Sequence, residues 1–271
     1  MATRIASWAK QVPSLNVLGY SDIGCERDTN EDAMAWDTTA GVVALADGMG
    51  GYQAGEVASA MAVSLFTNGF RCWLDEVGEY LANETLERQA VHIKTWLMMQ
   101  VQSIHDSILD AAALNADCMG MGTTLCGVVV WGDCAWVAHV GDSRVYTFDR
   151  ATHSLRCLTR DHSVFQERMD DGVLSEAEAR PLAQRHVLTR AIGVGDTVFP
   201  DIAIELFTDK TLLVLCSDGF SNVVNESLMV RVLKEHSTAL AGRLLLSQAM
   251  TLGGQDNISI VLMEKAKSLE A

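Results

Sequence analysis

Five aspartates lie at the ends of short apolar segments, where an extended strand would hold them at the edge of a sheet. Asp47 and Asp218 each follow an apolar run and precede a glycine, and Asp142 follows a third such run. Asp32 and Asp256 instead stand just before apolar runs. In an antiparallel sheet the start of one strand lies beside the end of its neighbour. Both kinds of aspartate can therefore meet at one edge.

Two of these aspartates are predicted to face each other. If segments 33–36 and 42–46 pair as a hairpin that is symmetric about its turn, Asp32 falls opposite Asp47. Carboxylates brought that close repel one another by several kcal/mol unless a proton or a cation compensates. A set of oxygen ligands without cysteine or histidine suits Mg²⁺ or Mn²⁺ better than zinc.

The glycines after Asp47 and Asp218 fit the same interpretation. A glycine permits a sharp turn and lets a backbone carbonyl come close enough to act as a ligand. Asp-Gly is also an ordinary turn dipeptide, and this is the simpler explanation of any one position taken alone. Five aspartates at strand ends together favour a metal site.

Composition excludes several classes of protein. The chain has 271 residues, of which 49% are hydrophobic and 20% charged, so general disorder is excluded and one large domain is expected. With 20 basic and 35 acidic residues, the net charge is −15. Because nucleic-acid affinity depends on clustered Lys and Arg, this balance argues against a nucleic-acid binder. It suits attraction of divalent cations or of a basic partner.

The sequence predicts neither a membrane span nor a secretory leader. The longest run without a charged residue, 118–132, is rich in glycine and shorter than the about 20 apolar residues that a span requires. The first residues contain no apolar run of signal-peptide length. Seven cysteines without a Cys-x-x-Cys pair are typical of reduced thiols buried in a core. We therefore predict a cytoplasmic protein without membrane insertion.

Short strands near both ends of the chain and helical segments between them predict an α+β domain with mainly antiparallel sheets. Segment 54–116 has apolar residues at helical spacing and no proline, and 226–236 and 239–252 are also predicted helices. The polar segment 160–193 is interpreted as helix and loop lying over a surface. The predicted strands are 15–20, 33–36, 42–46, 124–131, 134–140, 144–148, 202–206, 212–216 and 258–263.

Residues 24–32, GCERDTNED, resemble the G-x-x-R-x-x-N-E-D opening of the type-2C, metal-dependent (PPM) serine/threonine protein phosphatases of bacteria. Six further motifs of that family follow in its order, and the match runs from about residue 16 to residue 263. They are 46–51 (ADGMGG), 122–124 (GTT), 140–144 (VGDSR), 158–163 (LTRDHS), 216–219 (CSDG) and 254–257 (GQDN).

The resemblance implies a four-layer α-β-β-α sandwich, in which two antiparallel sheets are flanked by helices. It also implies an N-terminal extension over 1–15, a single phosphatase domain over 16–265 and a C-terminal tail over 266–271. The family's flap would correspond to about 160–193.

The same resemblance implies a site for two Mn²⁺ or Mg²⁺ ions. Asp47 would bridge both ions, and the carbonyl of Gly48 would bind one of them. Asp218 and Asp256 would complete the first ion, and Asp32 would hold the second mostly through water.

Further roles are implied around these ligands. Glu31 would orient metal-bound water. Asp142 with Asp218 would supply a third, weaker ion, as in bacterial members of the family. Arg27 resembles the family's phosphate-binding arginine, whose planar guanidinium grips two phosphate oxygens at once. We therefore expect Arg27, Asp47 and Asp218 to be the catalytic residues.

The activity implied is hydrolysis of phosphoserine and phosphothreonine on proteins by direct attack of a metal-bridging hydroxide. A Ser/Thr kinase of the eukaryotic-like class would be the opposing enzyme, and we expect a monomer. A metal-dependent phosphoesterase acting on a small molecule and a phosphoprotein-binding pseudophosphatase are the alternatives. The complete aspartate set argues against the pseudophosphatase.

Two departures from the animal enzymes leave the general acid open. Met49 fills the variable position of the Asp-Gly-x-Gly-Gly motif and cannot donate a proton, and Asn222 stands where those enzymes have a further aspartate. His162 belongs to a family motif near the flap, and both a structural and a catalytic role are open for it. His139, in an apolar strand, is predicted to be a core residue.

Overall fold

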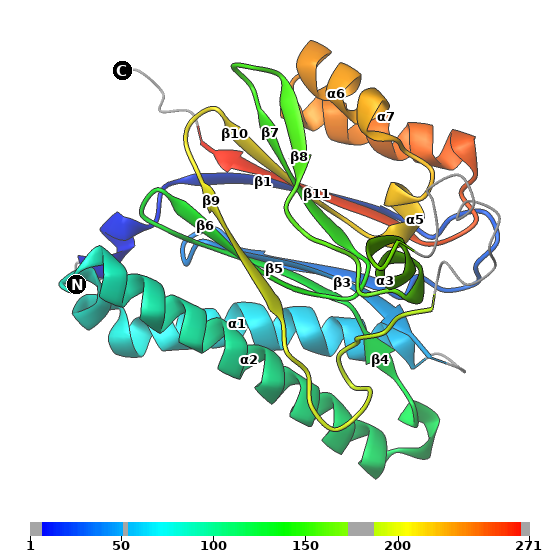
Figure 1. Ribbon diagram of the computed structural model, residues 1–271, viewed down its shortest axis with the longest axis horizontal. Helices are drawn as coiled ribbons and strands as arrows, with labels where there is room; N and C mark the ends of the chain where they lie inside the picture. The colour runs from blue at the N-terminus through cyan, green and yellow to red at the C-terminus, as the bar shows by residue number, and fades with distance from the viewer. Residues whose placement is uncertain (1–6, 51–53, 173–186, 267–271) are drawn as a thin grey trace, which may run out of the picture.

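The computed structural model describes residues 7–50, 54–172 and 187–266. Two antiparallel sheets stack face to face in the middle of the molecule, with a pair of long helices below one sheet and a second helical pair above the other (Figure 1). This is the four-layer α-β-β-α architecture predicted from the sequence. Residues 51–53 lie outside the described residues, and residue 51 is the last of the second motif. Residues 173–186, which fall within the flap segment, also lie outside them.

Each sheet brings together strands that are far apart in the sequence. The first and last strands pair with each other, so the two ends of the domain lie side by side at one edge of a sheet. In the described residues the first sheet runs, in spatial order, β1 (Leu15–Asp22), β11 (Ile258–Lys265), β10 (Thr211–Cys216), β7 (Arg144–Asp149) and β8 (Ser154–Cys157). The second runs β2 (Asp32–Asp37), β3 (Val42–Met49), β5 (Leu125–Trp131), β6 (Cys134–Val140) and β9 (Asp201–Leu206), with β4 (Gly122–Thr123) paired to the end of β3.

The long helical block predicted over 54–116 is two helices. The first ends at Ala82, with Asn83 as its C-cap. Thr85 begins the second, because its backbone is extended and its side chain accepts a hydrogen bond from the amide of Arg88, as an N-cap does. Asn225 caps a later helix in the same way. The helices are α1 (Gly55–Ala82), α2 (Leu86–Leu114), α3 (Val164–Asp170), α5 (Asp218–Ser221), α6 (Glu226–Glu235) and α7 (Thr238–Leu252), with single 3₁₀ turns at Ser7–Gln11 and Ala116–Cys118.

Strand β3 is packed on both faces where the site begins. Its side chains alternate between two buried faces. Val42 and Ala44 face the α1–α2 layer, and Val43 and Leu45 face the other sheet. Burial of a side chain of this size stabilises the fold by about 1.5–3 kcal/mol. The end of β3, which carries Asp47, is therefore held on both sides by packed core.

The cysteines correct one prediction. All seven are free, as expected, but only Cys126 and Cys216 are buried, and Cys25 and Cys72 are exposed. Cys25 lies in a loop, and Cys72 lies on the solvent side of α1. The apolar character of a cysteine does not determine whether its position in a loop or helix faces solvent. Among the described residues no helix is both long enough and apolar enough to cross a membrane.

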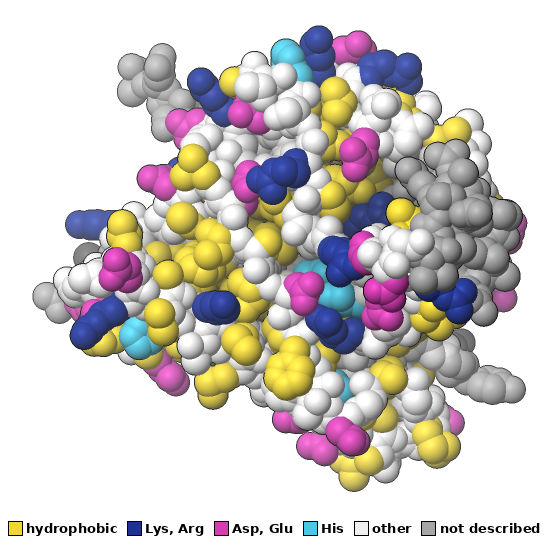
Figure 2. Space-filling view, in the orientation of Figure 1, with side chains coloured by type: hydrophobic (Ala, Val, Ile, Leu, Met, Phe, Trp, Pro, Cys, Tyr) yellow, Lys and Arg dark blue, Asp and Glu magenta, His cyan; other side chains and the backbone are white. Residues whose placement is uncertain are grey.

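Strand β9 forms the outer edge of the second sheet. Hydrophobic side chains gather along it on the face shown in Figure 2, and Ile204 and Leu206 are exposed there. Glu205, which lies between them in the sequence, pairs with Arg156 of β8. Because β8 belongs to the first sheet, this ion pair joins the two sheets at the edge of the sandwich. The strand begins at Asp201, close to the loops that carry the site.

Candidate metal centre

Asp32 and Asp47 face each other in the β2–β3 hairpin, in the register that the sequence predicts. Both carboxylate oxygens of Asp32 are buried and lack a hydrogen-bond partner among the described residues. Burial raises the pKa of Asp32 to about 7. The nearby hydroxyls of Ser217 and Ser259 act in the opposite direction, but neither lies in hydrogen-bonding geometry with the carboxylate.

The pKa of Asp47, the second carboxylate of this pair, is raised as well. Burial raises the pKa of Asp47 well above its ordinary value, and the charges of Asp32 and Asp218 add to the effect. A buried carboxylate pair of this kind is stabilised by a proton or by a cation. The donor set contains only oxygen, which suits a hard divalent ion.

A cavity of about 400 Å³ opens above Asp47. It collects residues from both sheets and from the loops between them, and it includes every predicted site residue except Asp32, which lies beneath it beside Asp47. The lining residues are Arg27, Glu31, Asp47, Gly48, Met49, Gly50, Thr124, Asp142, Leu188, Asp218 and Asp256.

The carboxylates line this cavity without closing round one point. Within the described parts of the chain, no three His, Cys, Asp or Glu side chains form a group that could hold an ion by themselves. An ion in the cavity therefore needs backbone carbonyls and water among its ligands, which is usual for Mg²⁺. The residues present fit a hard, partly hydrated cation.

The backbone of Asp47 is fixed by the Gly-Thr-Thr motif. The amide of Asp47 donates to Thr124 Oγ1 at 2.9 Å, and the Asp47 carbonyl accepts from the Thr124 amide and from Thr123 Oγ1, both at 2.9 Å. Thr124 Oγ1 also lies 2.7 Å from the hydroxyl of Ser143, which follows Asp142. The motif thus links two acidic positions of the cavity.

Gly48 must be glycine because other backbone passes too close for a side chain. A Cβ at this position would lie 2.1 Å from the carbonyl oxygen of Gly55. The amide of Gly48 donates to the carbonyl of Glu31 at 3.0 Å. The strand end that carries Asp47 is therefore locked to the start of α1 and to the segment before Asp32.

Arg27 reaches the cavity through an ion pair with Asp256, with 2.9 Å between Nη2 and Oδ2. The hydrogen bond to Asp256 raises the pKa of Arg27, and the charges of Glu31 and Asp47 act in the same direction. The side chain is 51% exposed, so the pair is weak and the guanidinium is free to turn toward a ligand. Burial raises the pKa of Glu31, which lies next to Asp32.

Two asparagines orient the acidic residues, and the sequence interpretation gave neither of them this role. Asn257 Oδ1 accepts from the amide of Glu31 at 2.8 Å, and its Nδ2 donates to the carbonyls of Ile23 and Thr29, both at 2.9 Å. Asn222 Nδ2 donates to Asp218 Oδ2 at 3.2 Å. The only sequence signal was their position, Asn257 directly after Asp256 and Asn222 four residues after Asp218.

Replacing Asn257 with alanine is expected to lower the free energy of unfolding by about 2–4 kcal/mol, because three partly buried backbone groups lose their hydrogen-bond partner. Asn257 itself is 5% exposed, so its removal also leaves a gap in the packing. The measurement is a urea titration of the Asn257→Ala variant. Asn68→Ala, which removes an exposed side chain, is the matched control. Equal midpoints for the two variants would contradict this role.

The two histidines singled out in the sequence lie together. His139 is a core residue, as predicted, and burial lowers its pKa to about 3. His162 is also buried, and its ring accepts a hydrogen bond from the amide of Gly141. Neither ring lines the cavity above Asp47.

A two-sheet sandwich flanked by helices, with an acidic cavity at its end, fits a metal-dependent phosphatase of the PPM type. Residues 25–250 match the family model for protein phosphatase 2C, and the chain belongs to this family. It is a metal-dependent serine/threonine protein phosphatase of the bacterial kind.

Named relatives agree with this assignment. The chain is 36% identical over 225 residues to the serine/threonine phosphatase stp of Listeria monocytogenes, covering 83% of this chain and 84% of that protein. Its fold is similar to the Streptococcus agalactiae serine/threonine phosphatase, with a TM-score of 0.80, 30% identity, and coverage of 93% of this chain and 100% of that one. The catalytic domain of the phosphatase PstP, solved in complex with two manganese ions, has a TM-score of 0.74, 29% identity, and coverage of 92% and 97%.

Proposed function

We propose that the cavity above Asp47 holds two Mn²⁺ or Mg²⁺ ions that share the Asp47 carboxylate. The Gly48 carbonyl, Asp218 and Asp256 would bind the first ion, and Asp32 would bind the second mostly through water. The observation that carries this proposal is the buried, unpartnered carboxylate of Asp32 directly opposite Asp47. The two manganese ions of the PstP catalytic domain support the count.

We place a third, weaker ion at Asp142 and Asp218. Both residues line the same cavity, and each follows a strand of a different sheet. Asp142 follows β6, and Asp218 follows β10. A site shared between a loop and the start of α5 is expected to bind less tightly than one built on the β2–β3 hairpin, because fewer of its groups are fixed by one element.

The metals, Arg27 and Glu31 would have separate roles in phosphate hydrolysis. When bound, the metals supply an activated water and offset charge on the phosphate. Arg27 would grip two phosphate oxygens with its guanidinium, and Glu31 would orient water. The described lining of the cavity contains no Cys, Ser or His, so attack by water without a phosphoenzyme fits the site.

The substrate of this enzyme is a phosphorylated protein, and we infer that a Ser/Thr kinase supplies it. A single phosphatase domain over 16–265 agrees with a sheet that begins at Leu15 and ends at Lys265. A monomeric state and a cytoplasmic location stay predictions.

Mn²⁺ is expected to raise the melting temperature of the metal-free protein by about 5–10 °C at a hundredfold excess over its dissociation constant, since binding adds about 2.7 kcal/mol to the stability. The measurement is a thermal melt in EDTA and in Mn²⁺, with calorimetry of the Mn²⁺ titration. Asp218→Asn should lose most of the shift. The exposed-site variant Asp110→Asn, on α2, should keep it. An unchanged melt of the unmodified protein in Mn²⁺ would remove the basis of the metal assignment.

A further inference from the structure

His162 forms two hydrogen bonds with Gly141, the residue before Asp142, one through its backbone amide and one through its ring. Its amide donates to the carbonyl of Gly141 at 2.7 Å, and the amide of Gly141 donates back to His162 Nδ1 at 3.0 Å. Gly141 has a φ of 108°, so the turn depends on glycine. The next residue along the chain, Asp142, lines the cavity.

The other ring nitrogen of His162 is held from β9. Because Nδ1 accepts a hydrogen bond, the hydrogen of a neutral ring lies on Nε2, which is 3.2 Å from Asp201 Oδ2. Arg190 Nη1 donates to Asp201 Oδ1 at 2.8 Å and to the carbonyl of Phe199 at 2.9 Å. Arg190 Nη1 also lies 3.1 Å from Nε2. The Gly141 amide therefore sets the tautomer of the ring, while Asp201 and Arg190 together hold its Nε2 side.

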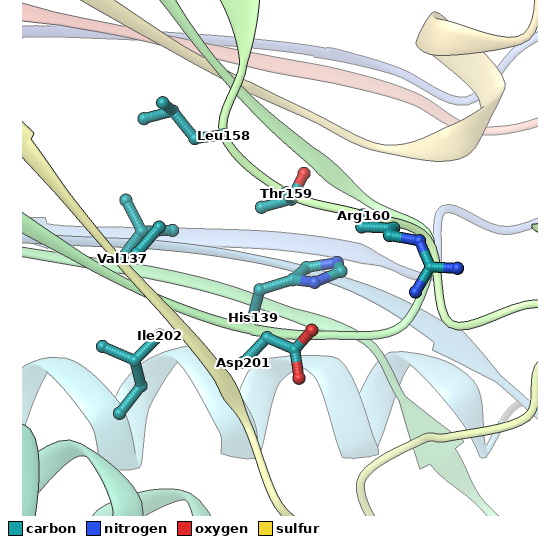
Figure 3. A pocket seen from close by; sticks show the side chains of 8 residues that line it. Val137, His139, Leu158, Thr159, Arg160, Asp201 and Ile202 are labelled. Carbon is teal, nitrogen blue, oxygen red and sulfur yellow. The ribbon is translucent and has the colours of Figure 1, made fainter. Parts of the chain in front are cut away.

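The plane of the ring is fixed by packing. The ring of His139 lies against that of His162, with 4.7 Å between centroids. Figure 3 shows the Asp201 carboxylate beside His139, at a cavity of about 180 Å³ that is also lined by Thr159 and Arg160. Asp201 is 56% exposed, so it anchors the ring from the surface of the molecule.

His162 also touches the chain that returns from the flap. The amide of Thr189 donates to the His162 carbonyl at 2.9 Å. Leu188, next to Thr189, lines the metal cavity together with Asp142. His162 thus connects the turn before Asp142, the end of the flap segment at Leu188 and Thr189, and strand β9.

We propose that His162 is a positioning residue that holds the Gly141 turn so that Asp142 faces the cavity and binds the weakest of the activating cations. This inference rests on the proposed role of Asp142. A histidine that only filled space would need none of these four hydrogen bonds, and the bond from the Gly141 amide to Nδ1 is the one that acts on the turn directly.

Two substitutions separate the two nitrogens of the ring. In His162→Asn, the amide oxygen can take the place of Nδ1 and accept from Gly141, while the bond to Asp201 is lost. In His162→Gln, the amide nitrogen can take the place of Nε2 and reach Asp201, while the acceptor for Gly141 is lost. Both side chains are polar and neutral, so differences between the variants report on geometry.

The first readout is hydrogen exchange of the Gly141 amide, followed by NMR in metal-free protein. Exchange is expected to become about tenfold faster in His162→Gln, the equivalent of one lost hydrogen bond, and to stay within about threefold in His162→Asn. Equal exchange rates in unmodified protein and in His162→Gln would overturn the assignment of the Nδ1 bond.

The second readout is calorimetry of Mn²⁺ binding. The dissociation constant of the weakest step is expected to rise about tenfold in His162→Gln and to change little in His162→Asn, with the tighter steps unaltered in both. Asp142→Asn serves as the reference and should abolish the weakest step. If Asp142→Asn abolishes it and His162→Gln leaves it unchanged, the positioning role is wrong while the metal assignment stands. If Asp142→Asn leaves it intact, Asp142 is not a ligand, and both proposals fail at this position.

Discussion

Replacing Asp47 with asparagine is expected to abolish phosphatase activity and, at the same time, to make the metal-free protein more stable. Activity should fall by about a thousandfold or more, because Asp47 is the carboxylate that both proposed ions share. The free energy of unfolding without metal should rise by about 1–3 kcal/mol, because asparagine removes a buried charge beside Asp32 and Asp218.

The pH dependence of this gain has a definite sign. The folded-state pKa of Asp47 lies above its value in the unfolded chain, so the folded state binds more protons. Stability of the metal-free protein should therefore fall as pH rises above the ordinary aspartate range, and Asp47→Asn should show a shallower decline. The measurements are urea titrations in EDTA at pH 5 and 8, and kcat/KM on a phosphothreonine peptide in Mn²⁺. Full activity, or lower stability of the variant in EDTA at pH 8, would contradict the role of Asp47.

Substitutions of Arg27 are expected to separate phosphate binding from metal binding. Arg27→Ala should lower kcat/KM about a hundredfold and Arg27→Lys about tenfold, because lysine keeps the charge but cannot grip two oxygens in one plane. Affinity for Mn²⁺ should not fall in either variant, since Arg27 is paired with Asp256 and its removal frees that carboxylate.

The comparison for Arg27 is Arg88, which pairs with Glu84 on the exposed side of α2. Arg88→Lys and Arg88→Ala should leave kcat/KM within about twofold, as expected for an exposed helix pair. Initial rates over a range of peptide concentrations, with Mn²⁺ calorimetry alongside, distinguish the two functions. Equal kcat/KM for Arg27→Lys and the unmodified enzyme would rule out two-point contact with phosphate.

The hairpin that pairs Asp32 with Asp47 could be predicted from the sequence because its register depends only on symmetry about a short local turn. The layered fold followed from strands at both ends and helices between them. The position of Asp142, Asp218 and Asp256 at one cavity was expected from the aspartates that begin or end strands, and from the family motifs.

Other features depend on contacts that the sequence does not display. The short strand β8 (Ser154–Cys157) has alternating exposure and few apolar residues. Its composition therefore does not predict a strand, which forms because the segment pairs with β7. The role of Asn257 depends on loops that are more than 200 residues away along the chain. The exposure of Cys25 and Cys72 depends on which side of a loop or helix faces solvent. Long-range packing decided each of these.

The most direct test of the metal mechanism is hydrolysis of a phosphothreonine peptide in EDTA, Mg²⁺ and Mn²⁺ by the unmodified protein and by Asp218→Asn. The site predicts turnover with Mn²⁺ or Mg²⁺, none in EDTA, and a loss of about a thousandfold in the variant, because Asp218 lines the cavity beside Asp47. Circular dichroism would establish that both proteins are folded. Turnover that persists in EDTA, or that survives in Asp218→Asn, would contradict a mechanism built on these carboxylates.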